Sequence, residues 1–149
     1  MALKVELKAG ERFILGDCLV TNGNQRTRLL IEGHTPILRE KDIMTAEQAN
    51  TPAKRIYLAV QLMYTARDPR LHHGTCFILM RDLLQAVPSA WPHIVAVNNH
   101  LLVGEMYKAL KSANALIVYE KELLDHATRG TNVRLGRHAD RKSTQDLRN

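Results

Sequence analysis

The chain has 149 residues, 45% of them hydrophobic, which suits one domain or one compact unit of two subdomains. It contains no apolar run of about 18 residues, so no transmembrane helix is predicted. The lysine-containing N-terminus also lacks the apolar region of a secretory signal. We therefore expect a cytoplasmic protein without a membrane partner. Its two cysteines, Cys18 and Cys76, are expected to be reduced and buried.

The positive charge is concentrated at the C-terminal end. Residues 1–43 contain seven basic and six acidic side chains, and residues 44–128 contain eight and seven. Residues 129–149 contain six basic and two acidic side chains, so this tail supplies most of the net charge of +6. A basic tail suits a polyanionic partner and equally suits a solubilising extension. We expect it to be flexible, because no apolar period runs through it.

Short strands separated by turn residues are predicted for the first third of the chain. The expected strands cover residues 4–8, 12–16, 18–21, 25–32 and 35–40. Val5 and Leu7 alternate with charged residues, as in a strand with one face on a core. Asn22-Gly23 is the strongest turn signal, since a tight primed turn needs positive φ. A sheet this small cannot bury a sufficient core alone, so it must rest on the helices or on a second copy.

The pattern turns helical from residue 44 onward. Thr45 and Gln48 have the spacing of a capping box, and Thr51 before Pro52 is the predicted N-cap of a helix over residues 52–66. Further helices are predicted over residues 75–86, capped by Thr75, over residues 89–102, capped by Ser89, and after Gly104 to about Thr128, where Gly130 follows.

Strands followed by helices, rather than alternating with them, predict an α+β fold. The expected organisation is a small N-terminal antiparallel β-sheet in residues 1–43, an α-helical subdomain in residues 44–128, and the basic tail in residues 129–149.

No motif for catalysis or cofactor binding is present. The sequence lacks the phosphate-binding loop and the GxGxxG, GxSxG and HExxH patterns. His72 and His73 are adjacent and would point apart, whereas His93 and His100 would lie about 10 Å apart along a helix. That separation is too wide for one first-row metal ion. We expect a binding protein rather than an enzyme, with no metal and no cofactor.

Two family resemblances are carried by named motifs. Gly10-Glu11, the run FILGD, the run GNQ and the run LRE fall in the order and near the spacing seen in CsrA carbon-storage regulators, which are small all-β mRNA-binding proteins. A second resemblance extends to about Thr128 and is carried by MALKVELKAGER, LREKDIM, TPAKRIYLAVQLMY and the later YKAL and LIVYE. These runs resemble the flagellin-synthesis repressor family FlbT. That resemblance implies a repressor that associates with the 5′ untranslated region of flagellin mRNA and promotes its decay.

Basic side chains on the predicted strands are the candidate RNA contacts. Arginine and lysine hold phosphates, and arginine also recognises guanine edges. Composition alone favours a simpler interpretation, in which these are solvated strand faces balanced by neighbouring carboxylates. The CsrA resemblance implies RNA along residues 3–8 of one subunit and 37–40 of its partner. Arg39 matches that family's arginine with one inserted residue, and Glu40 takes its place without it. The predicted RNA-binding residues are Lys4, Lys8, Arg26, Arg28 and Arg39.

Two hypotheses follow. In the first, the protein is a post-transcriptional repressor that occupies a flagellin mRNA leader, blocking the ribosome or exposing the message to nucleases. In the second, it is an adaptor whose helices bind another flagellar regulatory or assembly protein, and any effect on RNA is indirect. The near-neutral body favours the second hypothesis. Both a homodimer through the sheet and a monomer are open, because an unpaired sheet edge invites pairing while the helices could cover the same face.

Overall fold

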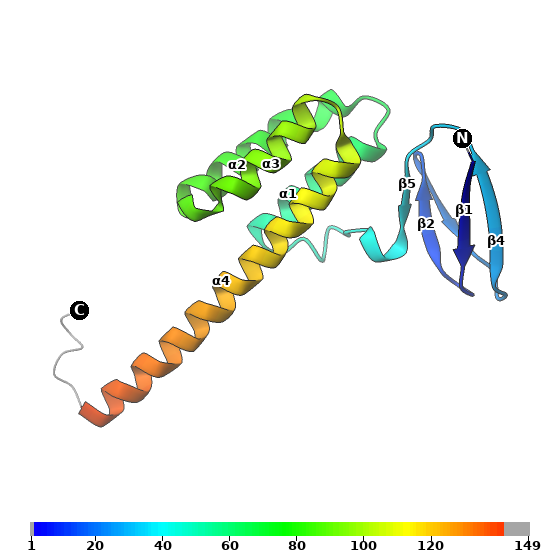
Figure 1. Ribbon diagram of the computed structural model, residues 1–149. Coiled ribbons are helices and arrows are strands. Elements are labelled where there is room, and N and C mark those ends of the chain that lie inside the picture. The colour runs from blue at the N-terminus through cyan, green and yellow to red at the C-terminus, as the bar shows by residue number, and fades with distance from the viewer. Residues whose placement is uncertain (1, 142–149) are drawn as a thin grey trace.

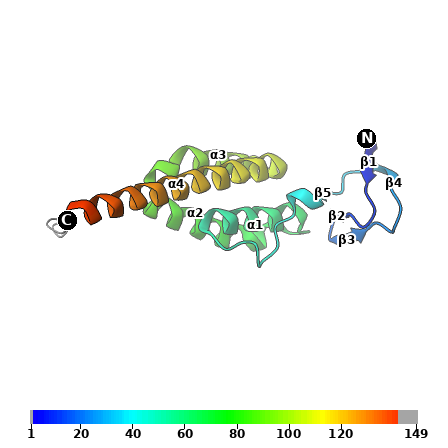
Figure 2. The ribbon, with the colours of Figure 1, turned by 90° about the horizontal axis from the view of Figure 1, so that it is seen from below.

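The computed structural model describes residues 2–141, and the side chains of residues 2–129 (Figure 1). Its strands are β1 (Ala2–Leu7), β2 (Arg12–Leu15), β3 (Cys18–Thr21), β4 (Thr27–Glu32) and β5 (Ile37–Arg39). Its helices are α1 (Pro52–Thr65), α2 (His73–Ala86), α3 (Trp91–Leu102) and α4 (Met106–Arg141), with short 3-10 helices η1 (Glu40–Asp42), η2 (Pro69–His72) and η3 (Pro88–Ala90). The predicted α+β fold is confirmed. The strands gather at one end and the helices extend away from them (Figures 1 and 2).

The strands form two small antiparallel sheets rather than one. β1 pairs with β4, and β2 lies between β3 and β5. Apolar side chains from both sheets bury Val5, Leu7 and Phe13 between them. The sheets therefore supply a small core of their own. A sheet dimer, which the sequence left open, stays a prediction.

The predicted primed turn at Asn22-Gly23 is wrong. The two-residue hairpin instead lies at Gly16-Asp17, between β2 and β3, where Gly16 has φ of +64°. After β3 the chain crosses to the other sheet, so residues 22–26 join strands that do not pair with each other. The side-chain amide of Asn22 donates to the carbonyls of Lys8 and Gln25, both at 2.8 Å, and to the Leu7 carbonyl at 3.5 Å. Asn22 therefore fastens two loops together instead of closing a hairpin.

Strand β5 joins the sheets to the helices. Successive strand residues point to opposite faces. Ile37 accordingly packs on the core between the sheets, while Leu38, only 1% exposed, belongs to the core of the helices. The Tyr64 hydroxyl, from α1, accepts a hydrogen bond from the Ile37 amide at 3.4 Å and donates one to the Ile37 carbonyl at 3.2 Å. The side of β5 that faces the helices is thus tied to α1.

Local capping signals position the start of the helical part. The Thr51 side chain accepts from the Lys54 amide at 3.2 Å, which confirms the predicted N-cap of α1. The predicted capping box is also confirmed: Thr45 Oγ1 accepts from the Gln48 amide at 3.2 Å, and Gln48 Oε1 accepts from the Thr45 amide at 3.0 Å.

Two predicted caps are wrong. Helix α2 already begins at His73, so Thr75 lies within the helix. The N-cap of α3 is Ala90 rather than Ser89, whose hydroxyl accepts from the Tyr119 hydroxyl of α4 at 2.6 Å. The Ser89 oxygen that was predicted to cap α3 therefore accepts a tertiary hydrogen bond instead.

Helix α4 continues past its predicted end near Thr128, to Arg141. No proline follows, and a glycine such as Gly130 within a helix costs only about 1 kcal/mol relative to alanine. The prediction of loop structure is therefore wrong for residues 131–141. The rest of the expected flexible tail, residues 142–149, lies outside the described residues. Along the described helices, no segment is long and apolar enough to cross a membrane.

The two cysteines differ in burial. Cys76 is fully buried in α2, as predicted, but Cys18 is exposed. Strand β3 has a neighbour on one side only and leaves most of its side chains in solvent, and this explains the wrong prediction for Cys18.

Replacement of Gln61 should destabilise the protein. This buried side chain of α1 accepts from the Met44 amide at 2.7 Å and donates to the Met44 carbonyl at 3.0 Å, holding the segment between η1 and α1. Gln61→Leu leaves both backbone groups without a partner, which should lower the free energy of unfolding by about 1–3 kcal/mol. Urea unfolding measures the change. The control Gln85→Leu, at an exposed position of α2, should change it by less than about 0.5 kcal/mol. Equal stability of the two variants would contradict this role.

Candidate nucleic-acid interface

Basic side chains at or just beyond the ends of separate strands meet in an open hollow of about 890 Å³. We call it the sheet hollow. It is lined by Glu6, Lys8, Ala9, Gly10, Glu11, Arg26, Arg39, Glu40, Lys41, Ile43 and Gln48. Four cationic and three anionic groups therefore surround one space. Three of the five predicted RNA-binding residues lie here, namely Lys8, Arg26 and Arg39.

The β1–β4 register brings Lys8 and Arg26 together. Leu7 pairs with Thr27 at the end of the antiparallel ladder, so Lys8, just after β1, and Arg26, just before β4, lie at the same end. The hydrogen bonds from the Asn22 side chain to the Lys8 and Gln25 carbonyls hold both chain segments there. Residues that are 18 positions apart along the chain thereby share one rim of the sheet hollow.

Arg39 is a structural cross-link as well as a lining residue. Its Nη2 donates to the Glu6 carbonyl of β1 at 2.8 Å and to the Glu11 carboxylate at 3.3 Å. Glu11 also accepts from the Lys8 amide at 2.9 Å. That backbone hydrogen bond, with a contribution from Arg39, lowers the pKa of Glu11 below 4.5. The Arg39 side chain is still 42% exposed, so it retains surface for an external ligand.

The other two predicted residues lie outside the sheet hollow. Lys4 is exposed on β1 and lines a separate, mostly apolar hollow of about 580 Å³, which it shares with Arg39 and Tyr107. Arg28 is exposed on β4 opposite Glu6, with 3.4 Å between Nη2 and Oε2. An exposed pair of this kind contributes little stability and leaves Arg28 available. The structure thus separates the five residues into one group of three and two flanking positions.

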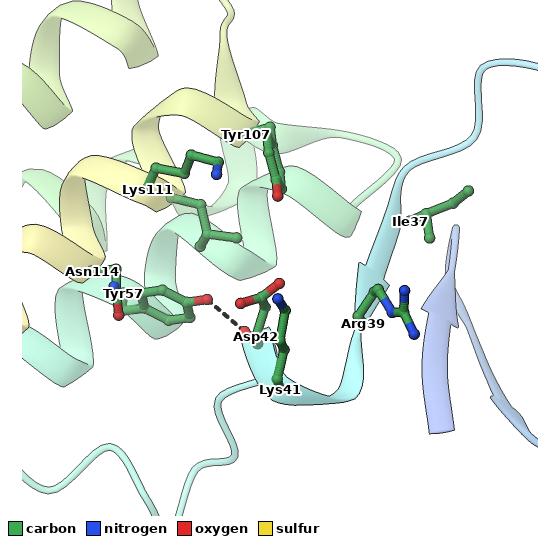
Figure 3. A pocket seen from close by; sticks show the side chains of 9 residues that line it. Ile37, Arg39, Lys41, Asp42, Tyr57, Tyr107, Lys111 and Asn114 are labelled. Carbon is green, nitrogen blue, oxygen red and sulfur yellow. Dashed lines mark hydrogen bonds between the residues drawn. The ribbon is translucent and has the colours of Figure 1, made fainter. Parts of the chain in front are cut away.

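A second cavity, of about 370 Å³, opens between the sheets and the helices (Figure 3). We call it the junction cavity. It is lined by Ile37, Arg39, Lys41, Asp42, Tyr57, Tyr107, Leu110, Lys111 and Asn114. Its charged groups are three cations and one carboxylate. Of the ion pairs found among described residues, none involves Lys41 or Lys111.

Two tyrosines of the junction cavity differ in role. Tyr57 is buried and donates to the Asp42 carbonyl, and burial raises its pKa well above 10, so it stays a neutral donor. Tyr107 is 43% exposed, and the Lys111 ammonium lies 5.2 Å from its ring centre. The predicted sheet contains one aromatic residue, Phe13, and that ring is buried. The accessible aromatic surface beside these cations therefore comes from α4.

Sequence reasoning did not identify Tyr107 and Lys111 as site residues. Their spacing of four places them on one face of a helix, which was the available signal. Nothing local in the sequence brings that helical face against β5. In the described part of the chain, no three His, Cys, Asp or Glu side chains cluster as a metal site.

Comparison with known proteins gives a consistent result over most of the chain. The family described as "Flagellar protein FlbT" matches residues 3–124. The "Probable flagellum biosynthesis repressor protein FlbT 1" of Bradyrhizobium diazoefficiens is 60% identical over 124 residues, covering 83% of this chain and 85% of the relative. The "Flagellum biosynthesis repressor protein FlbT" of Caulobacter vibrioides is 35% identical over 136 residues, covering 89% of this chain and 96% of the relative. No solved structure matches the chain.

Acid should remove the contribution of Glu11 to stability. Its pKa is lowered in the folded state, so this contribution is present above the unfolded pKa and is lost as the pH falls through the folded pKa. Glu11→Gln should therefore be less stable than wild type near neutral pH, and the difference should shrink below pH 4.5. Urea unfolding at several pH values measures this, with the exposed Glu47→Gln as control. A difference that stays constant down to about pH 3 would contradict the assignment.

Proposed function

The chain belongs to the FlbT family of flagellar proteins, and from that premise we propose that it binds the 5′ untranslated region of flagellin mRNA through the sheet hollow. This binding promotes decay of the message or blocks its translation. The names of its relatives support a repressor role in flagellum biogenesis. Beyond that role, we propose that the ligand is RNA and that the sheet hollow is the surface that binds it. We also propose that the protein acts in the cytoplasm, the compartment that contains the mRNA.

The observation that carries the proposal is the meeting of Lys8, Arg26 and Arg39, from separate strand ends, in one open hollow. Phosphate contacts supply much of the affinity for nucleic acids and set the register of the complex. Arg39 lines both the sheet hollow and the junction cavity, so an RNA backbone that crosses β5 would meet cations on both sides of the strand.

The carboxylates of the sheet hollow are compatible with RNA. Carboxylate oxygens accept hydrogen bonds from the amino groups of bases. Glu6 and Glu40 therefore favour a single strand whose unpaired bases face the protein over contact with the phosphate backbone alone. The near balance of charge in residues 1–128 also limits non-specific attraction to other polyanions. Binding at this surface should therefore depend on geometry more than on bulk charge.

Gel-shift titration of the purified protein with a flagellin leader RNA and a scrambled control tests the proposal. Lys8→Ala and Arg26→Ala should each weaken leader binding about threefold to tenfold and should lower the dependence of affinity on salt by about one phosphate contact. Arg81→Ala, at an exposed position of α2, is the matched control. Affinity that is independent of salt, or no preference for the leader, would rule out direct recognition.

A second candidate function is the adaptor predicted from the sequence. The observation that favours it is an apolar groove of about 370 Å³ on the helices, where Leu83, Val87, Leu116 and Leu124 line a space beside the start of α1. An amphipathic helix of another flagellar assembly factor is the occupant that such a groove suits. Under this alternative any effect on RNA is indirect.

Removal of the basic C-terminal end distinguishes the two candidates. Deletion of residues 131–149 takes away five basic and two acidic residues. Under the RNA hypothesis this should weaken leader binding and its salt dependence, because fewer phosphates are neutralised. Under the adaptor hypothesis, binding of a flagellar protein partner should be unchanged, since the apolar groove is intact. Titration and pull-down with the full and shortened chains measure both.

A further inference from the structure

We propose that the junction cavity binds one unpaired nucleotide of the RNA, with the base stacked on Tyr107 and the phosphate held by Lys41 and Lys111. This inference rests on the proposed RNA-binding function and deepens it, because it adds a site on the helical part of the chain. None of these three residues was among those predicted from the sequence to contact RNA.

The size of the junction cavity suits a single nucleotide. Its volume of about 370 Å³ lies at the lower end of the range of small-molecule sites, about 300–1,000 Å³. Its walls come from two parts of the chain, with β5 and η1 on one side and α1 and α4 on the other (Figure 3). A nucleotide flipped out of a strand lying on the sheet hollow would enter here, because Arg39 borders both spaces.

The charges of the junction cavity favour an anion. Lys41 follows β5 and Lys111 lies on α4, so the two ammonium groups approach the space from opposite walls (Figure 3). Both side chains are exposed, and among the described residues neither has an acidic partner within salt-bridge distance. Asp42 is the one carboxylate in the lining, and it stands against three cations. One phosphodiester between the two lysines would neutralise half of this excess of two positive charges.

The aromatic surface separates a nucleotide from a simple anion. Tyr107 is nearly half exposed at the cavity, and the Tyr64 ring, with its centre 5.9 Å away, supports it. Stacking on aromatic side chains is the usual way in which single-stranded RNA bases are held. The Lys111 ammonium now lies near this ring, at 5.2 Å, and a stacked base would displace it towards the phosphate.

Polar groups in the lining offer contacts to the edge of a base. Asn114 presents an amide with both a donor and an acceptor. The Tyr57 hydroxyl is already used, because it donates to the Asp42 carbonyl. Asn114 therefore offers a contact through which the junction cavity would discriminate between bases. An acidic peptide would use the two lysines but would gain nothing from a ring left free for stacking.

The test uses the full-length protein and the same flagellin leader RNA. Lys111→Gln and Tyr107→Leu should each weaken binding about tenfold. Tyr107→Phe should restore most of the affinity lost in Tyr107→Leu, since it keeps the ring. Lys121→Gln is the matched control, because it removes the same charge from the same helix at a position outside the cavity. Circular dichroism melts verify that each variant is folded.

Photo-crosslinking gives a readout that does not depend on a variant. Wild-type protein is irradiated with leader RNA containing 5-bromouridine, and the modified peptide is located by mass spectrometry. A crosslink in the peptide that contains Tyr107 supports the proposal. Crosslinks confined to the sheet hollow overturn it.

The outcomes separate this inference from the function on which it rests. If the wild-type protein does not bind the leader, both fail. In a second outcome, the wild-type protein binds and Lys8→Ala weakens binding, but Lys111→Gln and Tyr107→Leu bind as well as Lys121→Gln does. The RNA function then stands and the nucleotide site is wrong. If Lys111→Gln weakens binding but Tyr107→Leu does not, the cavity holds an anion without a stacked base, and the proposal is overturned.

Discussion

The three residues of β5 lie between two apolar cores, and the arrangement of the whole molecule depends on this double contact. Ile37 packs on the core between the sheets, and Leu38 packs with the helices. Because neighbouring strand residues point to opposite faces, so short a strand can serve both cores only in this register. The hydroxyl of Tyr64 bonds both backbone groups of Ile37 and holds the strand against α1.

The position of the Arg39 side chain follows directly from that arrangement. With Leu38 turned to the helices, Arg39 shares the face of Ile37 and reaches the Glu6 carbonyl on β1. The side chain thereby joins the two sheets, and it also borders the sheet hollow and the junction cavity. A single residue thus combines a structural role with the position best suited to contact a ligand on both sides of β5.

Helix α4 connects the candidate surfaces. Its first turns contribute Tyr107 and Lys111 to the junction cavity, and its middle contributes Leu116 and Leu124 to the apolar groove. The helix then projects beyond the other helices, away from the sheets (Figure 1). The two proposed binding surfaces therefore use different stretches of one helix.

The sequence by itself determined the five strands to within about two residues, the α+β order, the Thr51 cap and the capping box of Thr45 and Gln48. These features depend on period and on contacts a few residues apart, which are visible in the chain. Only the tertiary structure decided how the strands divide into two sheets, that Ser89 bonds α4 instead of capping α3, and that Tyr107 and Lys111 face Lys41. Each of these requires residues distant in the sequence to meet. The shared burial of β5 by two cores produces the last of these meetings, and no local pattern encodes it.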